Sequence, residues 1–89
     1  MAPQAHPSAL HNKAFGVILA ARRKELGLSQ ELLGFEAGID RSYISLLERG
    51  LRSPTLDTLF GLCPVLGITV SQLLILTESK LEEMDARPQ

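Results

Sequence analysis

The segment from Ser29 to Gly50, SQELLGFEAGIDRSYISLLERG, places the tightest limits on what this chain can fold into. Ser29 is a helix-start signal, because its hydroxyl can accept a hydrogen bond from an unpaired amide of the opening turn. Gly38 tolerates positive φ and predicts the end of that helix. Asp40 is a second start signal, and Gly50 predicts the end of the helix that follows it. The segment is therefore predicted to form two short helices joined by a tight turn.

Helices of roughly eight or nine residues do not bury a core alone, so both require packing partners from the rest of the chain. A short helix, a glycine turn and a second short helix form the pattern of a helix-turn-helix. The chain has 89 residues, which suits one small domain. Its 45% hydrophobic content is ordinary for a globular protein.

Several broad classes of protein are disfavoured. No apolar run approaches the roughly 20 residues of a membrane span, and the N-terminus lacks the basic and apolar regions of a secretory signal. Cys63 is the single cysteine, so no intrachain disulfide is expected and a reducing, cytoplasmic setting fits. His6 and His11 have no second ligand at metal spacing. No metal, no cofactor and no enzymatic site is therefore expected.

The charge of the chain is unevenly distributed. The net charge of −1 argues weakly against a nucleic-acid partner. However, residues 12–53 hold seven Lys and Arg against five Asp and Glu, whereas residues 54–89 hold two against five. The basic residues therefore belong to the half that contains the helix-turn-helix pattern, and local asymmetry matters more to a binding face than the total.

We expect three parts: a flexible arm (1–11), a helical domain (12–84) and a frayed tail (85–89). The domain should open with a helix from Asn12, as N-cap, to Leu26, with Phe15 and Leu19 on its apolar stripe and Gly27 closing it. A fourth helix should begin after Thr55 and end at Gly67, with Cys63 as a buried structural thiol. Pro64 should kink or shorten this helix, because it removes the bond to the carbonyl of residue 60.

A fifth helix should begin at Thr69 or Ser71 and extend to about Met84. Its apolar content suits two roles, closing the core or pairing with a second subunit. Within the second helix, Leu33 and Ala37 should be buried, and Gly34 should allow close approach of the following helix. Leu32 and Phe35 should pack on the first or fourth helix, with an exposed apolar patch as the alternative.

The helix from Arg41 to Arg49 divides into two faces at roughly 100° per residue. Ile44 and Leu47 share the inner face, with Glu48 at its margin. The opposite face and its flanks carry six residues: Arg41, Ser42, Tyr43, Ser45, Leu46 and Arg49. This outer face offers cations, hydroxyls and one hydrocarbon side chain but no acid, which favours contact with nucleic acid over an ordinary solvated surface.

The composite of GLSQ, AGI, YIS, LERG and SPTL resembles the lambda-repressor-like, Cro-type helix-turn-helix family, also called the xenobiotic-response-element family. The resemblance extends from about Phe15 to Leu74. It implies a compact five-helix, all-α domain that binds double-stranded operator DNA as a homodimer.

The resemblance also implies roles for single residues. Ser29 and Gln30 match positions beside a DNA phosphate, and Arg52 matches a loop position that often touches phosphate. Tyr43 and Arg49 match flanking positions that reach backbone or base edges. The positions that face the major groove match Arg41, Ser42, Ser45 and Leu46. The family's ion pair within the scaffold would join Arg23 to Glu48.

Three residues depart from the family's pattern. Leu46 stands where a long polar side chain is common, so it can touch a thymine methyl but cannot hydrogen-bond a base. Ala20 removes a common phosphate contact of the first helix, and Pro64 replaces a lysine or a similar residue.

The hypothesis is a transcriptional regulator that binds a palindromic operator as a dimer, with its third helix in the major groove and the C-terminal helix as a candidate dimer contact. The alternative is a protein-interaction module or antitoxin that mainly holds a protein partner.

Overall fold

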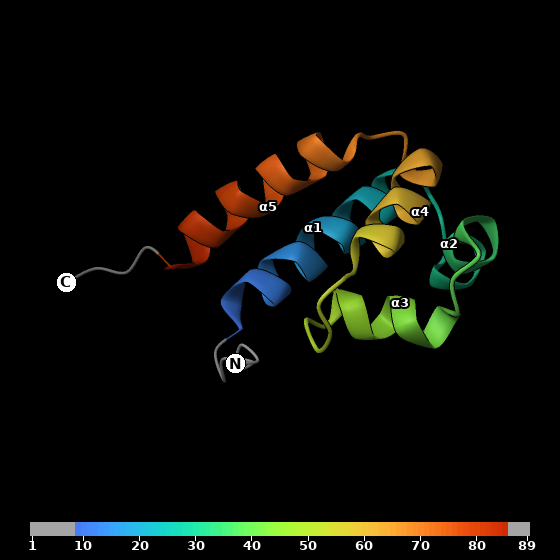
Figure 1. Ribbon diagram of the computed structural model, residues 1–89, viewed down its shortest axis with the longest axis horizontal. Coiled ribbons are helices and arrows are strands. Elements are labelled where there is room, and N and C mark those ends of the chain that lie inside the picture. Colours follow the sequence, from blue (N-terminus) through green and yellow to red (C-terminus); the bar gives the residue numbers. More distant parts are fainter. Residues whose placement is uncertain (1–8, 86–89) are drawn as a thin grey trace.

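The computed structural model describes residues 9–85 of the chain. Within them the backbone forms five helices and no strand: α1 (Leu10–Glu25), α2 (Gln30–Ala37), α3 (Arg41–Glu48), α4 (Leu56–Leu66) and α5 (Val70–Asp85). Figure 1 shows α1 and α5 running side by side, α3 along the lower edge, and α2 at the right. The predicted all-α, five-helix fold is confirmed. Residues 1–8 of the expected arm and 86–89 of the expected tail lie outside the described residues.

The core lies where all five helices meet. α1 packs against both α3 and α5, and α2 packs against α3 and α4. The largest fully buried side chains come from every helix: Leu19, Leu33, Ile44, Leu47, Leu62, Leu66 and Leu73. Helices this short gain most of their stability from such packing. The inner face predicted for α3 is confirmed, since Ile44 and Leu47 are both inaccessible to solvent.

Local hydrogen bonds confirm most of the predicted helix boundaries. The Ser29 hydroxyl accepts from the amide of Leu32 at 3.0 Å, and Thr55 accepts from Thr58 at 3.0 Å. At the start of α5, Thr69 Oγ1 accepts from the amide of Gln72 at 3.0 Å, while the Gln72 side chain accepts from the amide of Thr69 at 2.9 Å. This reciprocal capping box selects Thr69, rather than Ser71, as the residue that starts α5.

One predicted N-cap, Asn12, is wrong, and another, Asp40, lies at its predicted N-cap position but makes no side-chain cap bond. α1 begins at Leu10, so Asn12 lies inside the helix, and Ala9 at the cap position makes no side-chain cap bond. Asp40 does precede α3, but its side chain caps no amide. Its carboxylate instead accepts a hydrogen bond from the Ser42 hydroxyl. A nearby hydroxyl has competed successfully for the carboxylate, so α3 starts without a side-chain cap.

The packing predicted for Leu32 and Phe35 is also wrong. Phe35 is 81% exposed, and Leu32 and Leu26 are exposed too. α2 has only eight residues and buries Leu33 and Gly34. Successive residues of an α-helix are rotated by roughly 100° around its axis. Leu32 and Phe35 lie one or two positions from the buried pair, at rotations of roughly 100° or 200°, and therefore face solvent. The exposed apolar patch, left open as the alternative, is the observed arrangement.

Pro64 does not shorten α4, which continues to Leu66 and ends with Gly67 in the left-handed conformation. Pro64 lies on the exposed side of the helix, and Phe60, one turn earlier, is exposed as well. The backbone hydrogen bond that Pro64 cannot donate is therefore missing on the side of α4 that is exposed to water. Cys63 is buried as predicted, and its burial raises the pKa of the thiol.

Two helix crossings depend on the absence of a side chain. A Cβ at Gly34 would lie 2.4 Å from the carbonyl oxygen of Ile39, which confirms the predicted close approach, although the neighbour is the turn before α3. A Cβ at Gly16 would lie 2.5 Å from the carbonyl oxygens of both Leu47 and Glu48. The second crossing, of α1 over the end of α3, was not predicted from the sequence.

No single helix in residues 9–85 has the length and apolar content to cross a membrane. By length and composition alone, α4 and α5 would reach that threshold as a pair, but they meet at an angle of 101°.

Candidate nucleic-acid interface

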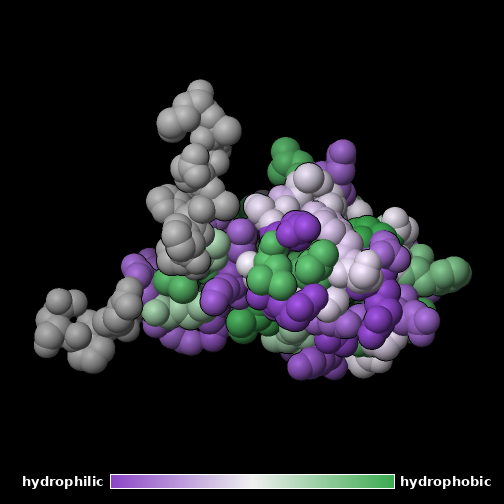
Figure 2. Space-filling model, turned by 90° about the horizontal axis from the view of Figure 1, so that it is seen from below, coloured by the Kyte–Doolittle hydropathy of each residue, from purple (hydrophilic) through white to green (hydrophobic). Residues whose placement is uncertain are grey.

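The outer face of α3 forms the lower surface of the molecule. Figure 1 shows α3 along that edge, and Figure 2, viewed from below, shows mainly hydrophilic residues around a small hydrophobic patch. Arg41, Ser42 and Arg49 are exposed on this helix, whereas Tyr43, Ser45 and Leu46 are half-buried. The six residues predicted to face outward are thus all accessible to solvent. Among the three half-buried residues, Leu46 has the hydrocarbon side chain.

Hydrogen bonds already organise part of this face. Arg49 Nε lies 3.4 Å from the backbone oxygen and 3.3 Å from the hydroxyl oxygen of Ser45, one turn earlier. Ser42 donates its hydroxyl hydrogen to Asp40, which leaves the Ser42 oxygen free to accept. Asp40 brings a carboxylate to the edge of a face that has no acid within the helix. The sequence indicates a carboxylate at this edge through the position of Asp40 directly before Arg41. An interpretation of Asp40 as a helix cap alone does not include this second role.

A buried cluster holds α3 in place. Arg23 Nε and Nη2 donate to the two carboxylate oxygens of Glu48 at 2.6 and 2.9 Å, which confirms the predicted ion pair. Arg23 Nη1 also donates to the carbonyl oxygen of Leu28 at 2.7 Å. The hydrogen bond to Glu48 raises the pKa of Arg23, although burial acts in the opposite direction.

Gln30 belongs to this cluster as well. Its side-chain Nε2 donates to Glu48 Oε1 at 2.9 Å, so a single carboxylate joins α1, α2 and α3. The side chain predicted to lie beside a phosphate is thus partly engaged in the scaffold, while the backbone amide of Gln30 remains at the first position of α2. Three hydrogen bonds to one carboxylate fix the tilt of α3 against the two helices behind it.

Ser29 and Arg52 lie at the two ends of the helix-turn-helix. Ser29 is exposed, and because its hydroxyl oxygen accepts from Leu32, its hydrogen remains available for an outside acceptor. Arg52 is exposed in the loop after α3, with Nη1 3.1 Å from the carbonyl oxygen of Leu51. Ser29 thus offers a donor beside the amides at the start of α2, and such amides suit an anion.

Arg22, like Arg23, lies in the last turn of α1, and its side chain stabilises the fold. Its Nε and Nη2 donate to the carbonyl oxygens of Leu66 and Gly67 at 2.8 and 3.2 Å, and Nη1 pairs with Glu25 at 2.9 Å. The guanidinium therefore satisfies unpaired carbonyls at the end of α4. Among residues 9–85, no group of three His, Cys, Asp or Glu side chains is placed to hold a metal ion.

The comparison with protein families identifies this architecture. The model of the HTH_3 helix-turn-helix family matches residues 19–73. The chain belongs to this family. The matched residues include the C-terminal part of α1, the whole helix-turn-helix, α4 and the start of α5, so the match covers the face described above.

Related proteins support the same conclusion. The chain is 39% identical over 66 residues to y4dJ, an HTH-type transcriptional regulator of Sinorhizobium fredii, covering 74% of this chain and 86% of that protein. It is 39% identical over 56 residues to the control protein C.BamHI of Bacillus amyloliquefaciens, covering 63% and 69% of the two chains.

Solved structures show the same fold. The restriction-modification controller protein C.AhdI of Aeromonas hydrophila is 40% identical, with a TM-score of 0.68 over 70% of this chain and 94% of that one. The clp gene regulator ClgR of Corynebacterium glutamicum is 26% identical, with a TM-score of 0.79 over 83% and 79%. This chain is a helix-turn-helix transcriptional regulator.

Proposed function

We propose that this regulator binds a palindromic DNA operator as a homodimer, with α3 of each copy in the major groove. The observation that carries the proposal is the outer face of α3, where exposed Arg41 and Ser42 stand on a helix fixed from behind by the Glu48 cluster. A two-fold dimer would place its half-sites about 34–36 Å apart, or a multiple of that distance.

Base contacts are assigned to the exposed start and centre of α3. Arg41 is exposed at the first position of the helix, where its guanidinium suits the O6 and N7 acceptors of guanine. Leu46 is half-buried at the centre of the face and suits the methyl group of thymine. Ser42 and Ser45 supply hydroxyls between them.

Phosphate contacts are assigned to the rim. Ser29 and the backbone amide of Gln30 form a donor pair at the start of α2. Arg49 and Arg52 are exposed cations beside the reading face, and Tyr43 offers its hydroxyl from the flank. These contacts set the position of the protein on the duplex without reading sequence, and they make binding sensitive to salt.

Selection of bound duplexes from random DNA, followed by titration of variants at several salt concentrations, tests the proposal. Arg41→Ala should relax specificity at one base pair, with a cost of about 1–3 kcal/mol there. Arg49→Ala should weaken binding to all sequences alike and reduce the salt slope by about one. Lys80→Ala, which removes a cation that pairs with Glu83 on α5, is the matched control and should change neither property. Absence of salt-sensitive binding to any selected duplex would refute the proposal.

One observation favours the alternative of a protein-binding module. Phe35 is 81% exposed and Leu32, one turn earlier, is exposed beside it. Co-purification with and without nuclease separates the two functions, because a partner held through DNA is released by the nuclease. A partner that stays bound after nuclease treatment and is lost in Phe35→Ser would establish this second function.

A further inference from the structure

A carboxylate stands at the end of α3 that is assigned to base contacts. Asp40 is exposed directly before Arg41, at the N-cap position of the helix. Its backbone carbonyl accepts from the amides of Tyr43 and Ile44 at 3.0 and 3.1 Å, but its side chain caps no amide. A carboxylate at this place is repelled by the phosphates of a bound duplex. Its position therefore implies a role that offsets this repulsion.

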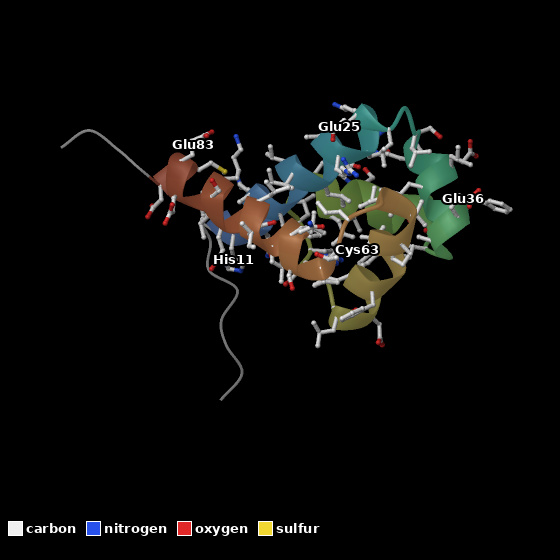
Figure 3. All side chains as sticks on the ribbon, turned by 90° about the horizontal axis from the view of Figure 1, so that it is seen from above. His11, Glu25, Glu36, Cys63 and Glu83 are labelled. Carbon is white, nitrogen blue, oxygen red and sulfur yellow. The ribbon has the colours of Figure 1, made fainter. Side chains whose placement is uncertain are left out.

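Neutralising Arg41 is not that role. Within the described part of the chain, no ion pair joins Asp40 to Arg41, so the guanidinium keeps its charge for an outside partner. Figure 3, seen from the side opposite the outer face of α3, shows Glu25, Glu36 and Glu83 at the outer edge of the molecule. Asp40 differs from these acids because it lies beside the residues assigned to bases.

The side chain of Asp40 has Ser42 as its partner. The Ser42 hydroxyl donates to Asp40 Oδ2, and both residues are exposed. An ionised carboxylate can only accept hydrogen bonds, so the hydrogen between the two side chains must come from the serine. Hydrogen bonds to a charged group are roughly twice as strong as neutral ones, so this bond directs the hydroxyl hydrogen toward Asp40. Only the lone pairs of the Ser42 oxygen then remain for a base.

The direction of this hydrogen bond limits which bases Ser42 can contact. A serine hydroxyl without such a partner can donate or accept, and so it discriminates poorly among bases. A hydroxyl that can only accept requires a donor on the base edge. In the major groove these donors are the exocyclic amino groups of adenine and cytosine, whereas guanine O6 and thymine O4 accept. Arg41 thus offers only donors, and Ser42 beside it offers only an acceptor.

We propose that Asp40 is a positioning residue for sequence specificity, which fixes the direction of the Ser42 hydroxyl so that Ser42 selects a base with an exocyclic amino group. The inference rests on the proposed binding of operator DNA through α3, and it names the class of base that one position of the operator must carry. Adenine and cytosine share the required amino group, and binding to duplexes that differ at that position separates them.

Removing the charge of Asp40 should change specific and non-specific binding in opposite directions. Asp40→Asn leaves an amide that can donate as well as accept, so the Ser42 hydroxyl can turn either way. Discrimination between amino-bearing and carbonyl-bearing bases at that position should then fall about fivefold or more. Affinity for non-specific DNA should instead rise, because one negative charge fewer faces the phosphates. A substitution that merely damaged the fold would weaken both kinds of binding.

Competition binding at one salt concentration, with duplexes that carry each of the four base pairs at every position of a selected site, tests the inference. The wild type should prefer adenine or cytosine on one strand at one position, and both Asp40→Asn and Ser42→Ala should lose that preference. Asp57→Asn is the matched control, since it removes the charge of an exposed aspartate from the first turn of α4. It should leave the base preference unchanged, and circular dichroism should show that all variants fold.

The double variant Asp40→Asn, Ser42→Ala separates a positioning role from a direct contact between Asp40 and a base. If Asp40 acts through Ser42, the double variant should show the same base preference as Ser42→Ala alone. A further change in the double variant, a preference that survives in Asp40→Asn, or a preference for guanine or thymine that depends on Ser42 overturns the inference and leaves operator binding intact. Failure of the wild-type chain to bind any selected duplex overturns the proposed function itself.

Discussion

Replacing Gly16 with alanine should weaken the contact between α1 and α3, because this crossing has no room for a methyl group. The new Cβ would lie 2.5 Å from the carbonyl oxygens of Leu47 and Glu48. Both neighbours are backbone atoms at the end of α3, so the helix itself must move by several tenths of an ångström to relieve the clash. That movement strains the hydrogen bonds between Arg23 and Glu48.

The expected magnitude combines two opposing effects. Overpacking a tight contact costs about 1–3 kcal/mol, and backbone neighbours place this site at the upper end of that range. Replacing glycine with alanine inside a helix gains about 1 kcal/mol. The net loss in the free energy of unfolding is therefore about 2 kcal/mol. For a domain of this size, such a loss lowers the melting temperature by roughly 8–16 °C.

Gly61 provides the matched control within α4. A Cβ there would lie 3.6 Å from the carbonyl oxygen of Ala37, an ordinary contact. Gly61→Ala should therefore keep the gain of about 1 kcal/mol and unfold at a higher denaturant concentration than the wild type. Urea titrations followed by far-UV circular dichroism measure both variants. If Gly16→Ala proves as stable as Gly61→Ala, the reasoning about this crossing is refuted.

Three further predictions concern the scaffold. Arg23→Met should lower the free energy of unfolding, measured by urea titration, by about 3–5 kcal/mol because it leaves Glu48 buried and underpaired. Adding Glu48→Met should recover part of that loss, and a double variant whose two costs simply add would contradict the prediction. Burial raises the pKa of Cys63, so the free energy of unfolding should fall as pH rises above about 8.5, and Cys63→Ala should show a shallower decline. Thr55→Ala should cost about 1 kcal/mol through its lost cap bond, whereas Asp40→Ala, where no amide is capped, should cost less in the same titration.

The sequence allowed prediction of features that depend on near neighbours in the chain. Ser29 and Thr55 lie within three residues of the amides that they cap, so a single residue type at one position carries the signal. Ile44 and Leu47 follow from helical periodicity. The pairing of Arg23 with Glu48 came from the resemblance to a family and not from spacing, since 25 positions separate the two residues.

Features that depend on how helices meet were not predictable in this way. Nothing beside Gly16 in the sequence indicates that the end of α3 crosses it. Similarly, the bond from Gln30 to Glu48 exists because the start of α2 meets the end of α3, and it changes the role of a side chain predicted to touch DNA. Phe35 was misassigned because a short helix buries fewer residues than its composition suggests.

The two ends of α3 are held very differently, and this difference has a dynamic consequence. The C-terminal end is fixed by Glu48 and the crossing at Gly16, whereas the N-terminal end has no side-chain cap. Amide protons near Ser42 should therefore exchange with solvent much faster than that of Leu47 in the free protein. The end that carries Arg41 can then adjust to the DNA surface while the other end acts as a fixed pivot. Binding should slow exchange most at the end that was loosest, so that part of the binding energy is spent on ordering one helical turn.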